Sequence, residues 1–212
     1  MPDLGAAMDT MRERYERSLA EHGPGSSQAV GWHDATWQQL RFGILAQVLE
    51  GEAPVTVADF GCGTGALFAH LAARAAPPPL GGYVGYDIVP AFVDAARAAH
   101  RDPRARFEVG SELAEDVDYV LASGALTLRP GITDEEWEEH IRGELARLWS
   151  RSRRGLAFNL LTRTESPREE GFYAGDPETW ARWCSRHLDG ALVALKWGPP
   201  LPDFAVLVRR AA

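Results

Sequence analysis

Cysteine is scarce in this sequence: only Cys62 and Cys184 occur among 212 residues, and they form no Cys-x-x-Cys spacing. This argues against a disulfide framework or a zinc site and fits a reducing compartment. Basic residues are also a minority, with 22 Lys and Arg against 30 Asp and Glu, a formal net charge of −8. The balance argues against a nucleic-acid partner, because nucleic-acid binders carry a clustered basic face. We interpret the brief Arg-rich patch at residues 151–154 as a solvated helix end.

Long apolar runs are missing as well. No segment approaches the roughly 20 apolar residues of a membrane-spanning helix. The first five residues lack the basic stretch followed by an apolar stretch that opens a secretory signal. We therefore expect no membrane partner and a cytoplasmic location. No Asp/Asp/Asn set or His pair stands out at ligand spacing, so no metal is expected.

What is present is ordinary for a folded protein, with 45% hydrophobic and 25% charged residues. The length favours a single domain over residues 1–212. Helical spacing runs from Ala6 to Ala20, in a segment that could act as a lid, and a second helix is predicted from Asp34, a suitable N-cap, to Leu49. We interpret residues 1–50 as an N-terminal helical cap and 51–212 as the core.

In the core, short apolar runs alternate with helical segments, which is typical of a mostly parallel sheet covered on both faces. The predicted strands are Val55 to Phe60, Gly82 to Tyr86, Ala105 to Val109, Val117 to Ala122 and Gly155 to Leu161. The predicted helices are Ala66 to Ala75, Pro90 to His100, Asp134 to Ser150 with Thr133 as cap, and Pro177 to His187.

The last two apolar runs, Ala191 to Trp197 and Phe204 to Val208, are joined by a short segment with three prolines. No helix fits there, and a parallel neighbour would need a crossover of about a dozen residues, so the pair is predicted to be antiparallel. The expected fold class is α/β: a seven-stranded, mostly parallel sheet with helices on both faces, an antiparallel last strand pair and an N-terminal helical cap.

A glycine-rich segment, Asp59-Phe60-Gly61-Cys62-Gly63-Thr64-Gly65, stands where the first strand should turn into a helix. Glycines there let the backbone approach a ligand at the helix N-terminus and at the carboxyl edge of the sheet. The same letters also satisfy a dinucleotide pattern. Asp59 favours a ligand with an ammonium or sulfonium group and would oppose a pyrophosphate. The short chain and the antiparallel last pair also argue against a nicotinamide cofactor.

A second acid, Asp87, ends the second predicted strand about twenty residues beyond the glycines. At this place a carboxylate can accept hydrogen bonds from both ribose hydroxyls of a bound nucleoside. The alternative is a cap for the helix that starts at Pro90, and the two roles are compatible.

The segments Val57 to Gly65 and Gly85-Tyr86-Asp87 together resemble motifs I and II of the class I S-adenosylmethionine-dependent methyltransferases. The order of strands extends the resemblance over most of the chain. It implies an S-adenosylmethionine site that includes Asp59, Gly61, Cys62, Gly63, Gly65, Asp87 and Ile88.

The resemblance also implies contacts from the third and fourth strands. The family often has an acid beside the adenine after the third strand; here Ser111 or Glu112 would take that place. The fourth strand ends in Ser123 and Gly124, which would face the methionine part and the methyl group. The Asn/Asp-Pro-Pro-Tyr sequence of relatives that methylate nucleic-acid bases or protein glutamine is not found at this point, which argues against those substrates.

The segment from His22 to Phe42 resembles the N-terminal cap of bacterial methyltransferases that act on small molecules and glycans. Within it, Trp32 would lie at the cofactor site. Arg41 could pair with the cofactor carboxylate, because a guanidinium matches a carboxylate in a bidentate way. The alternative is that Arg41 is a surface residue of an amphipathic helix.

Methyl transfer from a sulfonium needs alignment of nucleophile, carbon and sulfur more than it needs a base. If a base is used, His33 is the first candidate and Tyr173 the second, while Asn159 could orient the acceptor; each also has a structural alternative. Aromatic residues that could wall an acceptor pocket are Trp32, Trp37, Phe172, Tyr173 and Trp180.

The leading hypothesis is a methyltransferase that moves a methyl group to an oxygen or nitrogen of a small molecule, such as a metabolite, natural-product or glycan intermediate, and works as a monomer or homodimer. One alternative is a methyltransferase-like interaction module without catalysis. Another is a short NAD(P)-dependent reductase. The acceptor is left open, because the fold does not fix the function.

Overall fold

A computed structural model describes residues 4–32, 34–163 and 171–211. The N-terminal part is helical, as predicted. Its elements are α1 (Leu4–His22), the short 3-10 helix η1 (Ser27–Val30), α2 (Ala35–Leu45) and the 3-10 helix η2 (Ala46–Val48). The core elements are β1 (Val55–Phe60), α3 (Ala66–Ala73), β2 (Leu80–Asp87), α4 (Pro90–Ala99), β3 (Ala105–Val109), β4 (Val117–Ala122), α5 (Asp134–Arg151), β5 (Ser152–Thr162), β6 (Ala174–Gly175), α6 (Pro177–His187), β7 (Ala191–Trp197) and β8 (Asp203–Arg210).

The sheet has the predicted topology. Within the described residues its main path runs β3-β2-β1-β4-β5-β8-β7, with parallel pairing from β3 to β5 and antiparallel pairing of β8 with both β5 and β7. The seven-stranded sheet with an antiparallel last pair is therefore confirmed. One addition was not predicted: the two-residue strand β6 pairs with the end of β5.

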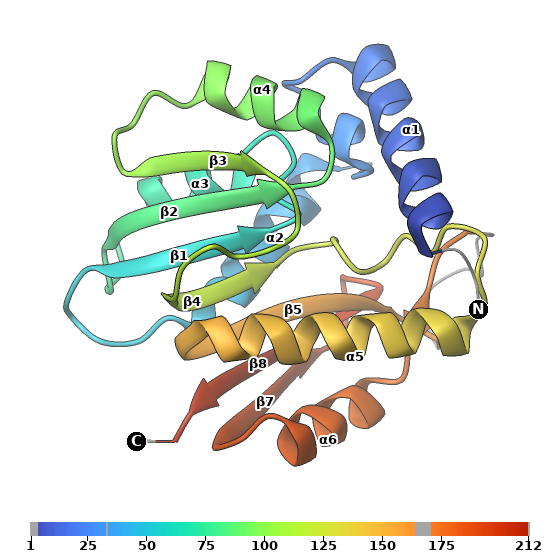
Figure 1. Cartoon of the computed structure of the whole chain (residues 1–212). Helices are drawn as coiled ribbons and strands as arrows, with labels where there is room; N and C mark the ends of the chain where they lie inside the picture. Colours follow the sequence, from blue (N-terminus) through green and yellow to red (C-terminus); the bar gives the residue numbers. More distant parts are fainter. Residues whose placement is uncertain (1–3, 33, 164–170, 212) are drawn as a thin grey trace.

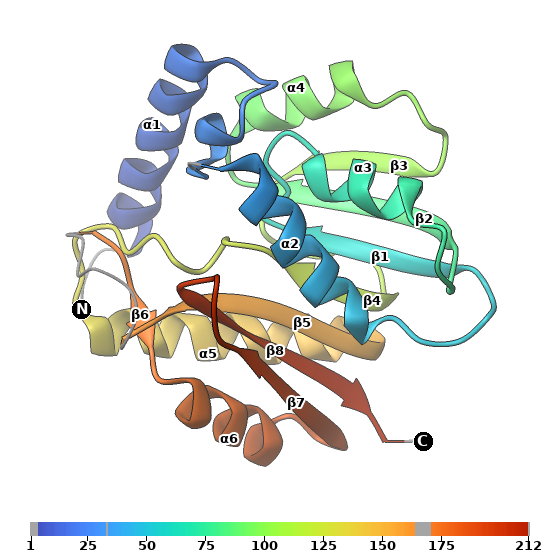
Figure 2. The same cartoon turned by 180° about the vertical axis from the view of Figure 1, so that it is seen from behind.

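Helices cover both faces of the sheet, because successive residues of each buried strand point to opposite sides. Ala58 and Phe60 of β1 pack into the core beneath α5 and α6, whereas Val55 and Val57 pack into the core beneath α2 and α3. Helices α5 and α6 lie in front of the sheet in Figure 1, and helices α2 and α3 lie in front of it in the reverse view of Figure 2.

Local sequence signals fix the main helix starts. The Asp34 carboxylate accepts a hydrogen bond from the Thr36 N–H at 2.6 Å and caps α2. Thr133 and Glu136 form a reciprocal capping box at the start of α5. Both predicted caps are thus confirmed. The second helix is shorter than predicted, since α2 ends at Leu45 and tightens into η2.

Helix α1 stands across the carboxyl ends of the parallel strands, where open α/β sheets bind ligands (Figure 1). The Arg12 side chain ties it there, because its Nε donates to the carbonyl oxygen of Ile88 at 3.2 Å, just beyond β2. Among the described residues, no helix combines the length and apolar character needed to cross a bilayer.

Candidate functional site

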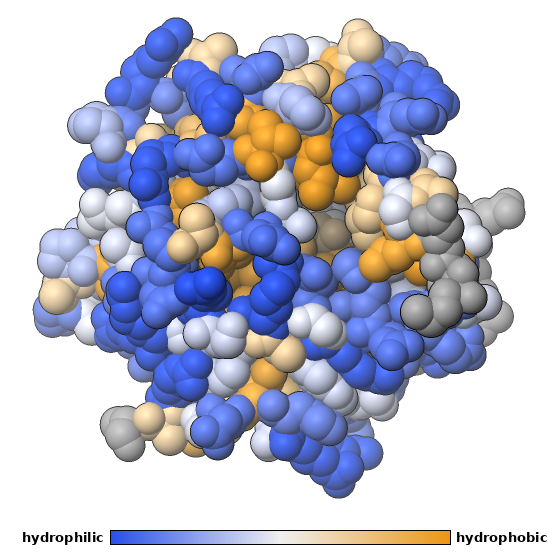
Figure 3. Space-filling model, in the orientation of Figure 1, coloured by the Kyte–Doolittle hydropathy of each residue, from blue (hydrophilic) through white to orange (hydrophobic). Residues whose placement is uncertain are grey.

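A cavity of about 540 Å³ opens at the carboxyl edge of the sheet. In the space-filling view, hydrophobic residues gather around a hollow near the middle of the molecule (Figure 3). The cavity is bounded by the glycine loop after β1, the ends of β2, β3 and β4, the inner face of α1, and one stripe of α5. From the sequence-predicted set it is lined by Trp32, Asp59, Gly61, Cys62, Gly63, Asp87, Ile88, Ser111, Ser123 and Gly124.

Two positions of the glycine loop leave no room for a side chain. Gly61 and Gly63 have φ values of +75° and +53°, in the left-handed region that favours glycine. A Cβ on Gly61 would lie 2.5 Å from the Cβ of Ala125, and one on Gly63 would lie 2.7 Å from Cγ1 of Val30. These glycines therefore allow the loop to pass close to two neighbouring segments while its backbone borders the cavity.

Asp87 connects β2 to this loop. One carboxylate oxygen accepts the Gly63 N–H at 2.8 Å, and the other accepts the Val89 N–H at 2.9 Å. Burial raises the pKa of Asp87, and these two backbone hydrogen bonds oppose the rise. The side chain both steadies the start of α4 and borders the cavity, so the two predicted roles are compatible in this geometry.

Asp59 is the more deeply buried acid, only 2% exposed. The Tyr83 hydroxyl donates to one of its oxygens. Burial raises the pKa of Asp59 to about 7; the bond from Tyr83 opposes this, and the nearby Asp87 adds to it. The cavity thus holds a carboxyl group whose negative form is favoured by a cationic ligand.

Ser123 and Gly124 follow β4 and border the same cavity. Among the described side chains, the Oγ of Ser123 is buried without a hydrogen-bond partner. Cys62, in contrast, is a buried thiol whose pKa is raised well above its ordinary value by burial. It therefore stays neutral and packs as an apolar group.

Four residues of the predicted cofactor and catalytic sets do not line the cavity: Arg41, Gly65, Glu112 and Tyr173. Trp37, Phe172 and Trp180, predicted to wall an acceptor pocket, and Asn159, predicted to orient the acceptor, do not line it either. Arg41 is neither a surface residue nor available to a cofactor carboxylate, because it is 4% exposed and its guanidinium binds Asp203. Glu112 is exposed to solvent. His33 lies outside the described residues.

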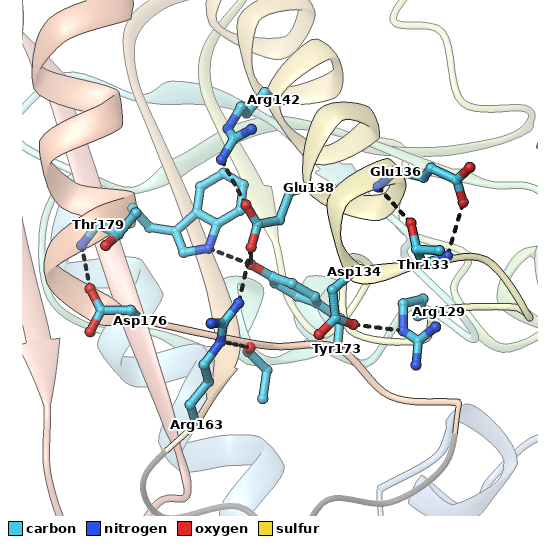
Figure 4. A network of polar contacts seen from close by, with 12 residues as sticks. Arg129, Thr133, Asp134, Glu136, Glu138, Arg142, Arg163, Tyr173, Asp176 and Thr179 are labelled. Carbon is cyan, nitrogen blue, oxygen red and sulfur yellow. Dashed lines mark hydrogen bonds and ion pairs between the residues drawn. The ribbon is translucent and has the colours of Figure 1, made fainter. Parts of the chain in front are cut away.

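Tyr173 is buried in a polar network away from the cavity. Its hydroxyl donates to Glu138 at 2.9 Å and accepts from Nε1 of Trp180 at 3.0 Å. Arg142 and Arg163 flank the same Glu138 carboxylate (Figure 4). Burial is the largest cause that raises the pKa of Tyr173. The expectation that this tyrosine acts as a base is therefore not supported; it links α5 to α6.

Helices α1 and α5 contribute cavity residues that the sequence patterns did not single out. Helix α1 supplies Leu4, Met8, Met11, Arg12 and Tyr15, and α5 supplies Trp137, His140 and Glu144. The spacing of the α1 set is helical, so its inward face was visible in the sequence, but its target was not. Burial raises the pKa of Tyr15 to about 12, with a further contribution from the charge of Asp87. Burial also lowers the pKa of His140, so its ring is neutral near pH 7.

Comparison with known proteins gives the chain a family. Residues 58–146 match the family described as a methyltransferase domain. A Mycobacterium tuberculosis protein named as a methyltransferase, Rv1506c, is 34% identical over 170 residues, which cover 78% of this chain and 99% of that protein.

Solved structures of methyltransferases share the fold. The magnesium protoporphyrin IX methyltransferase of Synechocystis PCC 6803 with bound S-adenosylmethionine superposes with a TM-score of 0.65 at 16% identity, covering 93% of this chain and 91% of that one. CalS10, an amino pentose methyltransferase of Micromonospora echinaspora, superposes with a TM-score of 0.58 at 19% identity, covering 93% and 97%.

Proposed function

The chain belongs to the class I S-adenosylmethionine-dependent methyltransferases, and we propose that it transfers the methyl group to an oxygen or nitrogen of a small molecule. One observation carries this proposal: the glycine loop and Asp87 share a single cavity with an apolar chamber beneath α1. A volume of about 540 Å³ suits a small ligand pair better than a macromolecular acceptor. The net charge of −8 also argues against nucleic acid.

The relatives give this substrate class some support. CalS10 acts on an amino pentose in calicheamicin biosynthesis, and the Synechocystis enzyme acts on magnesium protoporphyrin IX. Both are small molecules, although they differ greatly in size and polarity. The apolar residues Leu4, Met8 and Met11 on α1 favour an acceptor with an apolar surface here.

The residues at the cavity fit the cofactor. S-adenosylmethionine supplies a methyl group that is already activated on a positively charged sulfur. Asp59 offers negative charge to a cationic ligand, and the remaining acceptor positions of Asp87 suit the ribose hydroxyls. The unpartnered Oγ of Ser123 gives a polar group at the end of β4. Trp32 and Gly124 form the adjoining wall.

At the adenine end of the cofactor, Glu144 is a better candidate than Glu112. Glu112 was one candidate from the sequence, but it is exposed and does not border the cavity. Glu144 of α5 borders the cavity together with Ser111, whose carbonyl oxygen accepts a hydrogen bond from Arg147 at 2.7 Å. We assign the adenine amine to Glu144 and the base edge to Ser111.

For an oxygen acceptor a base would assist loss of the proton, whereas a neutral amine needs mainly orientation and exclusion of water. His33 remains our first candidate base. His140 is a second histidine for this role, because it borders the cavity and its lowered pKa keeps the ring neutral. Tyr173 is not a candidate base, because it does not line the cavity and its hydroxyl is bonded to Glu138 and Trp180.

Isothermal titration tests the cofactor half of the proposal. S-adenosylmethionine and S-adenosylhomocysteine should both bind, and NAD should not. Turnover tests the other half, with methyl-labelled cofactor and a panel of hydroxylated and amino metabolites. Binding without transfer to any acceptor would favour the alternative of an inactive interaction module.

Two further expectations belong to this proposal. The two buried cysteines suit a reducing cytoplasm, where thiols are not oxidised. A monomer or homodimer is expected, which sedimentation analysis would distinguish.

A further inference from the structure

A ring of contacts lies directly behind the cavity wall. Arg41 of α2, Asn159 of β5 and Asp203 of β8 form its hidden part, and they are 4%, 3% and 5% exposed. Arg41 Nε donates to both Asp203 oxygens at 2.9 Å, and Nη2 lies 2.8 Å from Oδ1. The Asn159 amide nitrogen donates to Asp203 Oδ2 at 2.6 Å. The Asn159 amide oxygen accepts the Gly124 N–H at 2.9 Å.

Trp32 closes the ring from the other side. The Arg41 guanidinium carbon lies 4.3 Å from the centroid of the Trp32 ring, a cation–π contact. The Trp32 ring in turn packs onto Gly124, where an added Cβ would lie 2.4 Å from Cζ2 of the tryptophan. Gly124 also has a φ of +73°, so only glycine suits this close approach.

The ring has a clear division of roles. Trp32 and Gly124 border the cavity, whereas Arg41, Asn159 and Asp203 do not. Arg41 contacts Trp32 through its stacked guanidinium, Asn159 contacts Gly124 through an amide hydrogen bond, and Asp203 joins Arg41 to Asn159. A change in the hidden part would therefore be transmitted to the wall without removing any group that touches a ligand.

Stability alone does not account for such a buried pair. Removing two charges from water is costly, and well-packed apolar replacements of a buried ion pair are often as stable. What the pair adds is fixed geometry, because the planar guanidinium meets the carboxylate with two donors and the indole with its face.

We propose that Arg41, Asp203 and Asn159 are positioning residues, which hold Trp32 and Gly124 in one arrangement and so set the shape of the cavity wall at the methyl end. This inference rests on the proposed function for the location of that end. It also gives Arg41 a role other than pairing with the cofactor carboxylate.

The test combines a conservative variant with a charge-free one. Arg41→Lys keeps the positive charge but loses the flat stacking surface and the forked donors. Arg41→Met combined with Asp203→Asn removes both charges, leaves no unpaired buried ion and keeps an oxygen for Asn159. The matched control is Arg210→Lys, since Arg210 stacks on Trp149 at 4.2 Å and neither residue lines the cavity.

Two measurements are made on protein labelled with 5-fluorotryptophan, in which Trp32→Phe assigns the Trp32 signal. The first is the ¹⁹F position of Trp32 with and without S-adenosylhomocysteine. The second is the Kd for S-adenosylhomocysteine. Both Arg41 variants should shift and broaden the Trp32 signal and weaken binding at least fivefold at a nearly unchanged Tm, while Arg210→Lys changes neither.

An unchanged Trp32 signal and Kd in the charge-free variant would overturn the proposal, and so would a lower Tm with both of these readouts intact. If Arg41→Lys does not fold, the charge-free variant decides alone. Absence of S-adenosylhomocysteine binding by the unaltered protein would instead contradict the proposed function. The Trp32 signal would still report on the ring in that case.

Discussion

The Asp87 carboxylate accepts the backbone N–H of Gly63 at 2.8 Å, so the acid at the end of β2 and the glycine loop after β1 are directly joined. The second oxygen of Asp87 is engaged with the N–H of Val89. Since each carboxylate oxygen can accept more than one hydrogen bond, Asp87 retains capacity for a ligand while it organises the loop. This double role makes it the most informative residue to change.

Asp87→Ala should weaken S-adenosylhomocysteine binding by about 10- to 100-fold, since a hydrogen bond to a charged group contributes about 1.5–3 kcal/mol. Isothermal titration provides the measurement. Asp94→Ala is the control, because Asp94 is an exposed acid of α4. An unchanged affinity in folded Asp87→Ala protein would remove the ribose role from this residue.

Asp59 predicts a pH dependence of cofactor binding. Its pKa of about 7 lies above the ordinary value of 3.8, so the folded protein retains a proton there that the unfolded chain has lost. The proton retained on Asp59 stabilises the folded state at low pH, and this stabilisation declines as pH rises from about 4 to about 7. A cationic ligand favours the carboxylate, so binding should release the proton. The affinity for S-adenosylmethionine should therefore rise from pH 6 to pH 8.

Asp59→Asn should flatten that profile. Titrations at pH 6 in two buffers of different ionisation enthalpy would count the released protons. Asp102→Asn serves as the control, because the pKa of this exposed acid is held at about 2 by Arg104 and it is ionised throughout. Equal pH profiles for Asp59→Asn and the unaltered protein would contradict the assignment.

Most of the fold could be predicted because the inner strands are buried and therefore form apolar runs. Apolar runs such as Val117 to Ala122 have the same bounds in the sequence and in the structure. The prediction was less accurate where polar residues open a strand: β5 begins at Ser152, directly after α5. Arg153 and Arg154, interpreted as part of a helix end, lie in that strand and donate to the carbonyl oxygens of Asp116 and Glu50.

The cavity could be predicted only in part, for a different reason. Gly61, Gly63 and Asp87 border it at positions that local sequence and strand order define. Partners that are distant in sequence leave no local pattern. Arg41 meets Asp203 across 162 positions, and nothing near Arg41 indicates a buried acid as its partner. The α5 stripe of His140 and Glu144 likewise faces the cavity only because of how the helix packs.

Gly63 should be intolerant of substitution, and a helical glycine gives a matched comparison. Gly63→Ala places a side chain at φ +53° and against Val30, so we expect a loss of stability of at least about 1–2 kcal/mol and weaker cofactor binding. Gly143 lies in α5 with no atom within 4 Å of an added Cβ. Gly143→Ala should stabilise the protein by about 0.5–1 kcal/mol. Urea unfolding would measure both, and similar effects would contradict the steric argument.

The adenine assignment is decided by comparing two glutamates. Glu144 borders the cavity on α5, and its neighbour Arg147 holds the loop after β3 through the carbonyl oxygen of Ser111. Glu112 belongs to the same loop but points to solvent. Glu144→Gln keeps the size of the side chain and removes the charge, so it should weaken S-adenosylhomocysteine binding about tenfold, at the lower end of the 1.5–3 kcal/mol for a hydrogen bond to a charged group. Glu112→Gln should leave the Kd unchanged in the same titration. The opposite result, a loss with Glu112→Gln alone, would return the adenine contact to the residue that follows the third strand in the sequence. It would also mean that α5 only walls the cavity there.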